Sequence, residues 1–534
     1  MLRTKTLSNA LPALPLSILP KCVQPIRLKA LGMGLLATIA GVMPWGIMSP
    51  SIAQGNGSPP SAELSRNSRF DRFCRISATE VQRKETLRIK AQESPQARSA
   101  YQAIVEEQGR WLQACRQSQW PNQQAMWLRL YPCDVQDDRL AKVLDQVVSA
   151  GYNQVFLEVF YDGRVLLPQA DNVTAWPSVI TTPGYENVDL MAKTIAAGRE
   201  RGLEVHAWLF TLNFGYSYSE RSDRSSVIAR NGRNQSSLDL LQGETQVFID
   251  PYHPLAQSDY TQLLDLVLQR KPDGFLFDYV RYPRGTGATS VVSQVKDLLI
   301  YSPAAQSALL KRALNNKGRE LIDRFLKKGF VSVGDLDQVN KLYPQEGEPL
   351  WQGRSVPPPQ PPNSQPPNSQ PIPTAQQQAR IQQELWLLGV AHAHRGVLDF
   401  LEMAIQTVRS QNLRAGAVFF PGGNQMVGQS GFDARLQPWN QFSPTIAWNP
   451  MSYAACGRTD CILAEIQRVL SQAPNGTFIQ PVLAGAWNTG GDRPSLEEQM
   501  TAIQRSFPQV NAVSHFAYSW QYPQDDRERK FCRL

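Results

Sequence analysis

The sequence predicts an α/β protein built on a (β/α)8 TIM barrel, because short apolar runs alternate with helical patterns along most of the chain. An open, doubly wound sheet is the alternative, but no glycine-rich dinucleotide fingerprint follows any of the runs. Eight parallel strands close a barrel of this kind. Eight runs with the length and the β-branched or aromatic content of buried strands lie at 126–130, 154–160, 205–210, 274–282, 415–420, 445–453, 478–484 and 512–520.

Amphipathic patterns between these runs predict the outer helices of the barrel. In the first of them, Leu140, Val143, Leu144 and Val147 recur at the spacing of one helix face. Glycines at 151 and 202 stand where the first two helices should end. The patterns lie at 137–150, 188–201, 254–269, 381–410, 460–471 and 495–505, so we expect the barrel to occupy 126–523.

Two additions to the barrel are expected. Residues 77–120 are rich in charged residues, Gln and Ala with helically spaced apolar residues, and predict an N-terminal helical extension. An insertion at 285–378 follows the fourth strand and contains helical patterns at 304–314 and 318–330. Its last part, 356–378, repeats Pro-Pro-Asn-Ser-Gln and should be a flexible, polyproline-like tract.

The N-terminus has the pattern of a targeting segment. Basic residues up to Lys29 precede an apolar stretch at 31–48 and the small residues before Gln54, so we expect a signal peptide at 1–53, cut after Ala53. An uncleaved membrane anchor is the alternative. Either reading implies export to the periplasm or the cell exterior. A flexible leader is expected at 54–76.

Composition narrows the class of partner. The formal net charge is +8, but five basic residues lie in the first 54 positions, which hold no acid, so the remainder carries +3. No basic stripe predicts nucleic-acid binding, and an aromatic-rich chain of low charge favours an uncharged substrate. The five histidines are scattered, so we expect no metal and no cofactor.

Cysteine usage agrees with export. Six cysteines follow Cys22, and an even number in an oxidising compartment predicts up to three disulfides. Six cysteines allow 15 different disulfide connectivities. We expect Cys456 and Cys461 to pair across their short loop, and Cys74 or Cys115 to tie the helical extension down.

Polar side chains at the ends of the predicted strands are the candidate site, because barrels of this kind carry their chemistry at the carboxyl ends of the strands. Charges in apolar strands need close partners, so Arg129 and Glu158 form either a structural ion pair or part of a site. The histidines are either core residues or acid–base groups, and the aromatics are either packing or platforms for sugar rings. The candidates for substrate binding are Arg129, Asp162, His206, Trp208, Asp250, Tyr279, Arg281, Tyr453, His515 and Trp520.

Three motifs together resemble the glycosyl-hydrolase-like family 10 proteins, which are exported bacterial TIM barrels. They are Gly-Leu-Glu-Val-His-Ala-Trp at 202–208, Phe-Ile-Asp-Pro-Tyr-His-Pro at 248–254 and Asp-Gly-Phe-Leu-Phe-Asp-Tyr-Val-Arg-Tyr-Pro at 273–283. The resemblance extends over about 126–520. It implies a glycosidase-like barrel with the acid of the fourth strand at Asp278. The chain departs from the family at Glu158 and Phe160 on the second strand and at 449–451 on the sixth.

We therefore expect a glycoside hydrolase that acts on an envelope or extracellular polysaccharide. Such enzymes use two carboxyl groups on either side of the scissile bond. Asp278 is the first, and Glu158 is the second, because burial would raise its pKa and suit a general acid. Asp162 and Asp250 are the reserves. A non-catalytic carbohydrate-binding or envelope-scaffold protein, and a deacetylase or lyase, are the alternatives.

Overall fold

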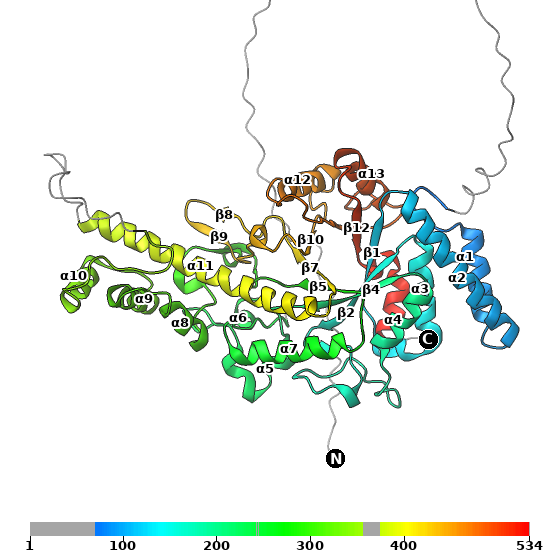
Figure 1. Ribbon diagram of the computed structural model, residues 1–534, viewed down its shortest axis with the longest axis horizontal. Helices are drawn as coiled ribbons and strands as arrows, with labels where there is room; N and C mark the ends of the chain where they lie inside the picture. The colour runs from blue at the N-terminus through cyan, green and yellow to red at the C-terminus, as the bar shows by residue number, and fades with distance from the viewer. Residues whose placement is uncertain (1–69, 242, 244, 356–373, 533–534) are drawn as a thin grey trace, which may run out of the picture. The chain divides into compact units, whose positions relative to one another are not determined.

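The structure is a computed structural model that describes residues 70–241, 243, 245–355 and 374–532 (Figure 1). The expected signal peptide, most of the expected leader and most of the proline-rich tract lie outside the described residues.

Eight parallel strands form the centre of the molecule. Each pairs with the next along the chain, β12 pairs with β1, and bridges from Trp448 to Ile479 and from Met451 to Val482 join β10 to the β11 segment. The sheet therefore returns on itself, which confirms the (β/α)8 barrel and excludes the open sheet. The strands are β1 (Gln123–Leu128), β2 (Gln154–Tyr161), β4 (Glu204–Phe210), β5 (Gly274–Asp278), β7 (Arg414–Phe419), β10 (Ala447–Pro450), β11 (Val482–Ala484) and β12 (Ala512–Phe516).

Alternate residues of each strand point into the barrel, as the two-residue period of a strand requires. The ring of Trp127 on β1 contacts those of Trp208 on β4 and Phe156 on β2, with centroids 4.6 and 5.5 Å apart. The Trp127 indole also donates a hydrogen bond to Ser514 on β12 at 3.1 Å. These contacts identify the inward-facing set of each strand, which decides which polar residues can reach the mouth.

Helices cover the outside of the barrel, and local signals set their ends. Asp189 caps the second outer helix by accepting a hydrogen bond from the Ala192 backbone at 2.8 Å, and Ser495 and Glu498 form a capping box at another. The outer helices are α3 (Asp137–Ser149), α4 (Leu190–Glu200), α7 (Pro254–Leu268), α11 (Thr374–Arg409), α12 (Thr459–Leu470), α13 (Leu496–Ser506) and α15 (Pro523–Lys530).

Short elements fill the connections between the barrel strands and the outer helices. The single-turn helices are α5 (Tyr216–Ser219), α6 (Ser237–Leu240) and α14 (Tyr518–Gln521). The 3-10 turns are η1 (Pro132–Val135), η2 (Gln169–Asp171), η3 (Ser222–Val227) and η6 (Trp439–Gln441), and the short strands are β3 (Arg164–Val165), β8 (Met426–Val427) and β9 (Gly431–Asp433).

The N-terminal extension is a pair of helices, α1 (Ala78–Lys90) and α2 (Pro95–Ser118), which pack against α3 (Figure 1). Arg116 of α2 is buried and donates hydrogen bonds to the carbonyl oxygens of Phe73 and Gly151 at 2.5 and 2.9 Å. The expected boundary of the flexible leader at residue 76 is wrong, because Phe73 and Cys74 are already buried against the barrel.

The insertion after β5 contains η4 (Gly287–Ser290), β6 (Val291–Val292), η5 (Val295–Asp297), α8 (Pro303–Leu310), α9 (Asn316–Lys328) and α10 (Val333–Leu342). Figure 1 shows these helices beside the N-terminal half of α11, and α9 buries Leu321, Ile322 and Phe325. The expected flexible tract ends too late, since α11 begins at Thr374 and residues 374–378 are helical.

Three disulfides join Cys74 to Cys115, Cys133 to Cys532 and Cys456 to Cys461. The last pair and the link to the helical extension agree with expectation. Disulfides persist in oxidising compartments, so they indicate an extracytoplasmic location. Within the described ranges, no helix has the length and apolar character that a membrane span requires.

Candidate functional site

Asp278 is the last residue of β5 and lies at the carboxyl-end mouth of the barrel. Its carboxylate accepts a hydrogen bond from the Tyr279 backbone N–H at 2.6 Å and another from Trp208 Nε1 at 3.2 Å. The side chain is 4% exposed and forms no ion pair with any described Lys or Arg. Burial raises the pKa of Asp278 to about 6, and the two hydrogen bonds and the Arg281 charge only partly oppose this rise.

Glu158 and Arg129 form an ion pair beside Asp278, in which Glu158 is buried and the Arg129 side chain is 33% exposed. Arg129 Nη2 donates to Glu158 Oε1 at 3.0 Å, and its Nε contacts the other carboxylate oxygen. Burial raises the pKa of Glu158, with Asp162 and Asp278 adding to the rise and Arg129 opposing it. Neutral Glu158 would take away the carboxylate that Arg129 contacts directly, so we consider the pair ionised.

The two carboxyl groups come from strands that lie on either side of β4. Glu158 is level with Trp208, and Asp278 is level with Phe210, two residues nearer the mouth. Neighbouring strands are about 4.8 Å apart, so the backbones of β2 and β5 are roughly 10 Å apart. Both side chains point inward, and the Asp278 charge is close enough to raise the pKa of Glu158.

Aromatic side chains surround Asp278. Tyr279 has a φ of 52° and its ring lies 4.2 Å from that of Phe210, measured between centroids. The Tyr453 ring lies 5.9 Å from Phe516, and burial raises the pKa of its hydroxyl, with Asp278 and Tyr279 adding to the effect. Tyr279 and Tyr453, two of the predicted site residues, therefore lie at the same mouth as Asp278.

Asp162 is the exposed carboxylate of the mouth. It follows β2 with a φ of 45°, and Gly163 comes directly after it. Its charge acts on Glu158, Arg129 and Tyr279, which places it near all three. Asp162 therefore remains a second candidate for the partner of Asp278.

Neither of the expected histidines reaches the mouth. His206 faces inward but lies one inward position below Trp208, where its Nε2 is 2.9 Å from the Gln154 amide. It lines a hollow of about 750 Å³ at the amino-terminal end of the barrel. His515 lies between the inward-facing Ser514 and Phe516, so it points outward, where its Nδ1 is 2.7 Å from the Tyr152 hydroxyl. Burial lowers the pKa of both imidazoles.

Asp250 and Trp208 serve the framework of the site. Asp250 is fully buried and accepts hydrogen bonds from Ser302 Oγ at 2.7 Å and from the backbone N–H groups of Tyr252 and Ala305, both at 2.9 Å. It therefore fixes the start of α8 and has no free oxygen for a substrate. Trp208 is 4% exposed, and its indole holds Asp278 rather than offering a surface for a sugar ring.

Sequence reasoning missed a group of residues that follows β7. Asp433 pairs with Arg435 Nε at 2.9 Å and with Arg284 Nε at 3.1 Å. The Arg435 guanidinium lies 4.2 Å from the centre of the Phe420 ring, and that of Arg281 lies 5.5 Å from the same centre. Of these residues, the sequence predicted Arg281, because it lies near the end of a predicted strand. Residues 433–435 lie in a connection whose sequence has no strand pattern, so it gave no signal for them.

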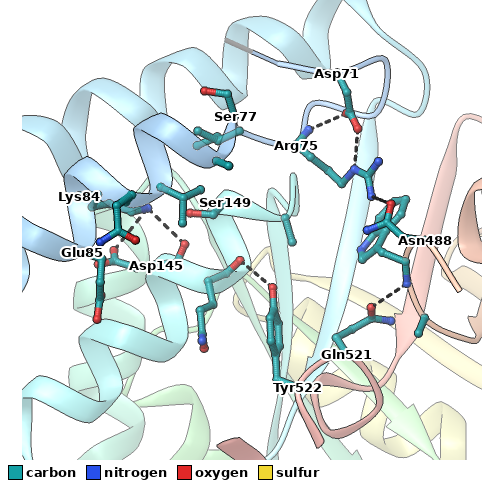
Figure 2. A pocket seen from close by; sticks show the side chains of 18 of the residues that line it. Asp71, Arg75, Ser77, Lys84, Glu85, Asp145, Ser149, Asn488, Gln521 and Tyr522 are labelled. Carbon is teal, nitrogen blue, oxygen red and sulfur yellow. Dashed lines mark hydrogen bonds and ion pairs between the residues drawn. The ribbon is translucent and has the colours of Figure 1, made fainter. Parts of the chain in front are cut away.

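A second hollow, of about 1,100 Å³, lies outside the barrel between α1, α3 and the segments after β11 and β12 (Figure 2). Its charged side chains form ion pairs, among them Arg75 with Asp71 at 2.5 Å and Lys84 with Asp145 at 3.8 Å. Trp520, 39% exposed, lines this hollow and contacts Phe516 of the mouth. The hollow thus adjoins the candidate site but has balanced charges.

Among the described residues, no group of three or more His, Cys, Asp or Glu side chains is arranged to hold a metal ion.

Several solved glycoside hydrolases have a similar but distant fold. The PgaB (BpsB) glycoside hydrolase domain from Bordetella bronchiseptica is 13% identical, with 76% of this chain and 98% of that chain covered and a TM-score of 0.46. The β-amylase catalytic domain from Paenibacillus polymyxa is 11% identical, with 74% and 92% covered and a TM-score of 0.43. The GH20 exo-β-N-acetylglucosaminidase from Vibrio harveyi is 10% identical, with 79% and 58% covered and a TM-score of 0.38. TM-scores below 0.5 decide nothing about reaction or substrate.

No curated protein sequence matches the chain. The family model described as glycosyl hydrolase-like 10 matches residues 106–304, which confirms the predicted resemblance over the stretch that carries β1, β2, β4, β5 and Asp278.

Proposed function

We propose that the protein is a glycoside hydrolase that cleaves O-glycosyl bonds in an envelope or extracellular polysaccharide. The observation that carries this proposal is Asp278, an enclosed carboxyl at the barrel mouth that has hydrogen-bond donors but no ion-pair partner among the described side chains. A pKa raised to about 6 keeps a large share of this carboxyl protonated in mildly acidic solution. The glycosidase-like barrel supports the proposal, since its ligand would be a carbohydrate.

Asp278 is the general acid in this proposal. Its proton would pass to the glycosidic oxygen as the bond to the leaving sugar breaks, and Trp208 and the Tyr279 N–H would then stabilise the carboxylate. This assignment differs from the expected role of Glu158 as the acid, because Arg129 contacts both oxygens of Glu158.

Glu158 is the second carboxyl of the proposal and acts in its ionised form, as nucleophile or base. The strand spacing supports a separation within the range of about 5 to 10 Å that paired carboxyl groups of glycosidases span. Asp162 competes for the role because it is exposed. Single Glu158→Gln and Asp162→Asn variants separate the two, since only loss of the working carboxylate should abolish turnover.

Product release from a panel of polysaccharides tests the proposal. We expect the wild-type protein to release new reducing ends and Asp278→Asn to reduce the rate by about 10²- to 10⁴-fold, the usual contribution of a general acid. Asp337→Asn, an exposed substitution on α10, is the matched control and should leave the rate unchanged. Undiminished turnover by Asp278→Asn would remove Asp278 from the mechanism.

The pH profile separates an acid from a base at this position. If Asp278 donates the proton, kcat/KM falls as pH rises through about 6, because the carboxyl loses its proton there. A rate that instead increases through the same range would assign Asp278 the role of base or nucleophile.

A second candidate is a non-catalytic carbohydrate-binding or envelope-scaffold protein on the same barrel. The observation in its favour is the engagement of both Glu158 oxygens by Arg129, which leaves Asp278 as the one enclosed carboxyl of the described mouth without an ion pair. Glycan binding without product from any bound polysaccharide would select this candidate.

We also propose that residues 1–53 direct export and are removed. The extracytoplasmic location indicated by the disulfides supports this step. N-terminal sequencing of the exported protein should begin at Gln54, whereas a retained N-terminus would favour the membrane-anchor alternative.

A further inference from the structure

Positive charge exceeds negative charge on the side of the mouth formed by β5 and β7. Among the described residues, Asp278 and Asp433 are the carboxylates that act on Arg281, and three guanidinium groups, those of Arg281, Arg284 and Arg435, lie around Asp433. Arg284 and Arg435 share this carboxylate, so its one negative charge balances only part of the cluster. The remaining positive charge lies beside Asp278, because Arg281 is three residues further along the same segment.

Arg281 is the least satisfied member of the cluster. Its Nη1 donates to the Tyr282 carbonyl at 3.0 Å, and it forms no ion pair with a carboxylate of the described chain. A guanidinium has five N–H donors in a planar fork, so most of them remain for a ligand. Its planar face lies 4.6 Å from the centre of the Tyr279 ring, which holds the fork in place.

Arg435 is positioned to act with Arg281. Its bidentate contact with Asp433 fixes the guanidinium, and both arginines lie over the ring of Phe420. Burial lowers the pKa of both side chains. The Arg284 charge adds to this effect on each of them, and the Arg281 charge adds to it on Arg435. An anionic partner stabilises partly buried cations more than exposed ones, because water compensates the charge of a buried group poorly.

We infer that the mouth binds a sugar residue that carries a carboxylate or sulfate group, with Arg281 and Arg435 holding that group while Asp278 faces the glycosidic bond. The planar, bidentate fit of a guanidinium to such oxyanions supports this class of substituent. The inference rests on the proposed function for the orientation of the sugar, but not for the binding itself. It differs from the expectation of an uncharged substrate. That expectation came from the low net charge of the whole chain, which gives no sign of a local excess of positive charge at the mouth.

Arg281 could instead serve only as a counter-charge for Asp278, whose pKa it lowers. Two features of the experiment separate these roles. Binding is measured in Asp278→Asn protein, in which the Asp278 carboxylate is no longer there for Arg281 to balance. Arg435 is substituted as well, because it does not contribute to the pKa of Asp278.

The experiment compares charged oligosaccharides with their neutral twins. The full-length Asp278→Asn protein is titrated with uronate-containing oligosaccharides and their carboxyl-reduced forms, and with sulfated oligosaccharides and their desulfated forms. We expect the charged member of at least one pair to bind about tenfold or more tightly, the size expected for one charge-assisted contact. The preference should decrease between 50 mM and 500 mM NaCl, and the pair that shows it identifies the substituent.

Variants of the two arginines complete the test. Adding Arg281→Gln or Arg435→Gln should abolish the preference, whereas Arg281→Lys should keep part of it and Arg319→Gln, an exposed residue of α9, should keep all of it. The inference is overturned if neutral and charged twins bind equally, if no charged oligosaccharide binds, or if the preference survives both Gln substitutions. Charge-selective binding without turnover by the wild type would refute the hydrolase and leave the inference intact. Turnover of neutral glycans alone would support the hydrolase and overturn the inference.

Discussion

Asp278 combines near-complete enclosure with hydrogen bonds that come only from neutral N–H groups. Arg129 and Glu158, in contrast, compensate one another directly. This difference between two neighbouring carboxyl groups follows from what each strand brings next to it, a tryptophan in one case and an arginine in the other.

The raised pKa of Asp278 predicts a dependence of stability on pH. A carboxyl whose pKa is higher in the folded state stabilises the protein below its usual pKa of 3.8, and this contribution is lost as pH rises through about 6. At about 1.4 kcal/mol per pKa unit, the loss is on the order of 3 kcal/mol. The side chain at position 278 of the Asp278→Asn variant cannot ionise. The unfolding free energy of this variant, measured in urea from pH 4 to 7.5, should therefore increase relative to that of the wild type as pH rises. A constant difference would show that Asp278 titrates normally.

Individual site residues were predictable only where position along a strand was enough. Asp278 follows an apolar run on the fourth predicted strand, and this position, together with the family resemblance, predicted it at the mouth. His515 is also in a strand, but its direction depends on which neighbours face inward, and the contacts of Ser514 and Phe516 decide this. The His206 side chain points into the barrel, as the mouth requires, but it lies too far from the mouth along the strand. Its distance from the mouth depends on the register of β4 against β2 and β5.

At the scale of elements, the insertion is joined to the barrel through Asp250. One oxygen of this carboxylate accepts hydrogen bonds from Ser302 Oγ and the Ala305 N–H, so it caps α8, while the other accepts from the Tyr252 N–H. The motif at 248–254 is therefore explained by the attachment of a helix.

Asp250→Ala should destabilise the protein by about 3 kcal/mol, because it leaves several buried donors without acceptors at a cost of about 1 to 3 kcal/mol each. Ser302→Ala removes one of these hydrogen bonds and should cost about 1 kcal/mol. Asp337→Ala on α10 is exposed and should change the unfolding free energy by less than about 0.5 kcal/mol. Chemical denaturation of the three variants measures the series, and equal values for all three would contradict the capping role.

The elements themselves were largely predictable from the sequence. All eight strands and the main outer helices occur where periodicity indicated them, because burial on one helix face or along a whole strand leaves a direct trace in the sequence. The boundaries of the leader and of the proline-rich tract were not predictable, since the packing of Phe73 and the start of α11 depend on contacts with distant residues.

At the scale of the whole molecule, Cys133 and Cys532 connect the segment after β1 with the residues that follow α15, across 399 positions. The Cys456–Cys461 bond, in contrast, spans five positions.

Loss of the long-range disulfide should cost more stability than loss of the local one, because the longer link removes more entropy from the unfolded chain. We expect the Cys133→Ser/Cys532→Ser double variant to lose about 4 kcal/mol of unfolding free energy and the Cys456→Ser/Cys461→Ser variant about 2 kcal/mol. Denaturation curves under non-reducing conditions give both values. An equal loss in the two variants would mean that loop length does not determine their contributions.

The pairing of β12 with β1 also orders events during synthesis. Until residues 512–516 have been made, one edge of β1 has no neighbouring strand, although the other edge can already pair with β2. An unpaired edge of an apolar strand is a template for pairing with other chains. Residues up to 516 must therefore be synthesised before that edge of β1 is paired, and until then the edge is open to pairing with other copies of the chain.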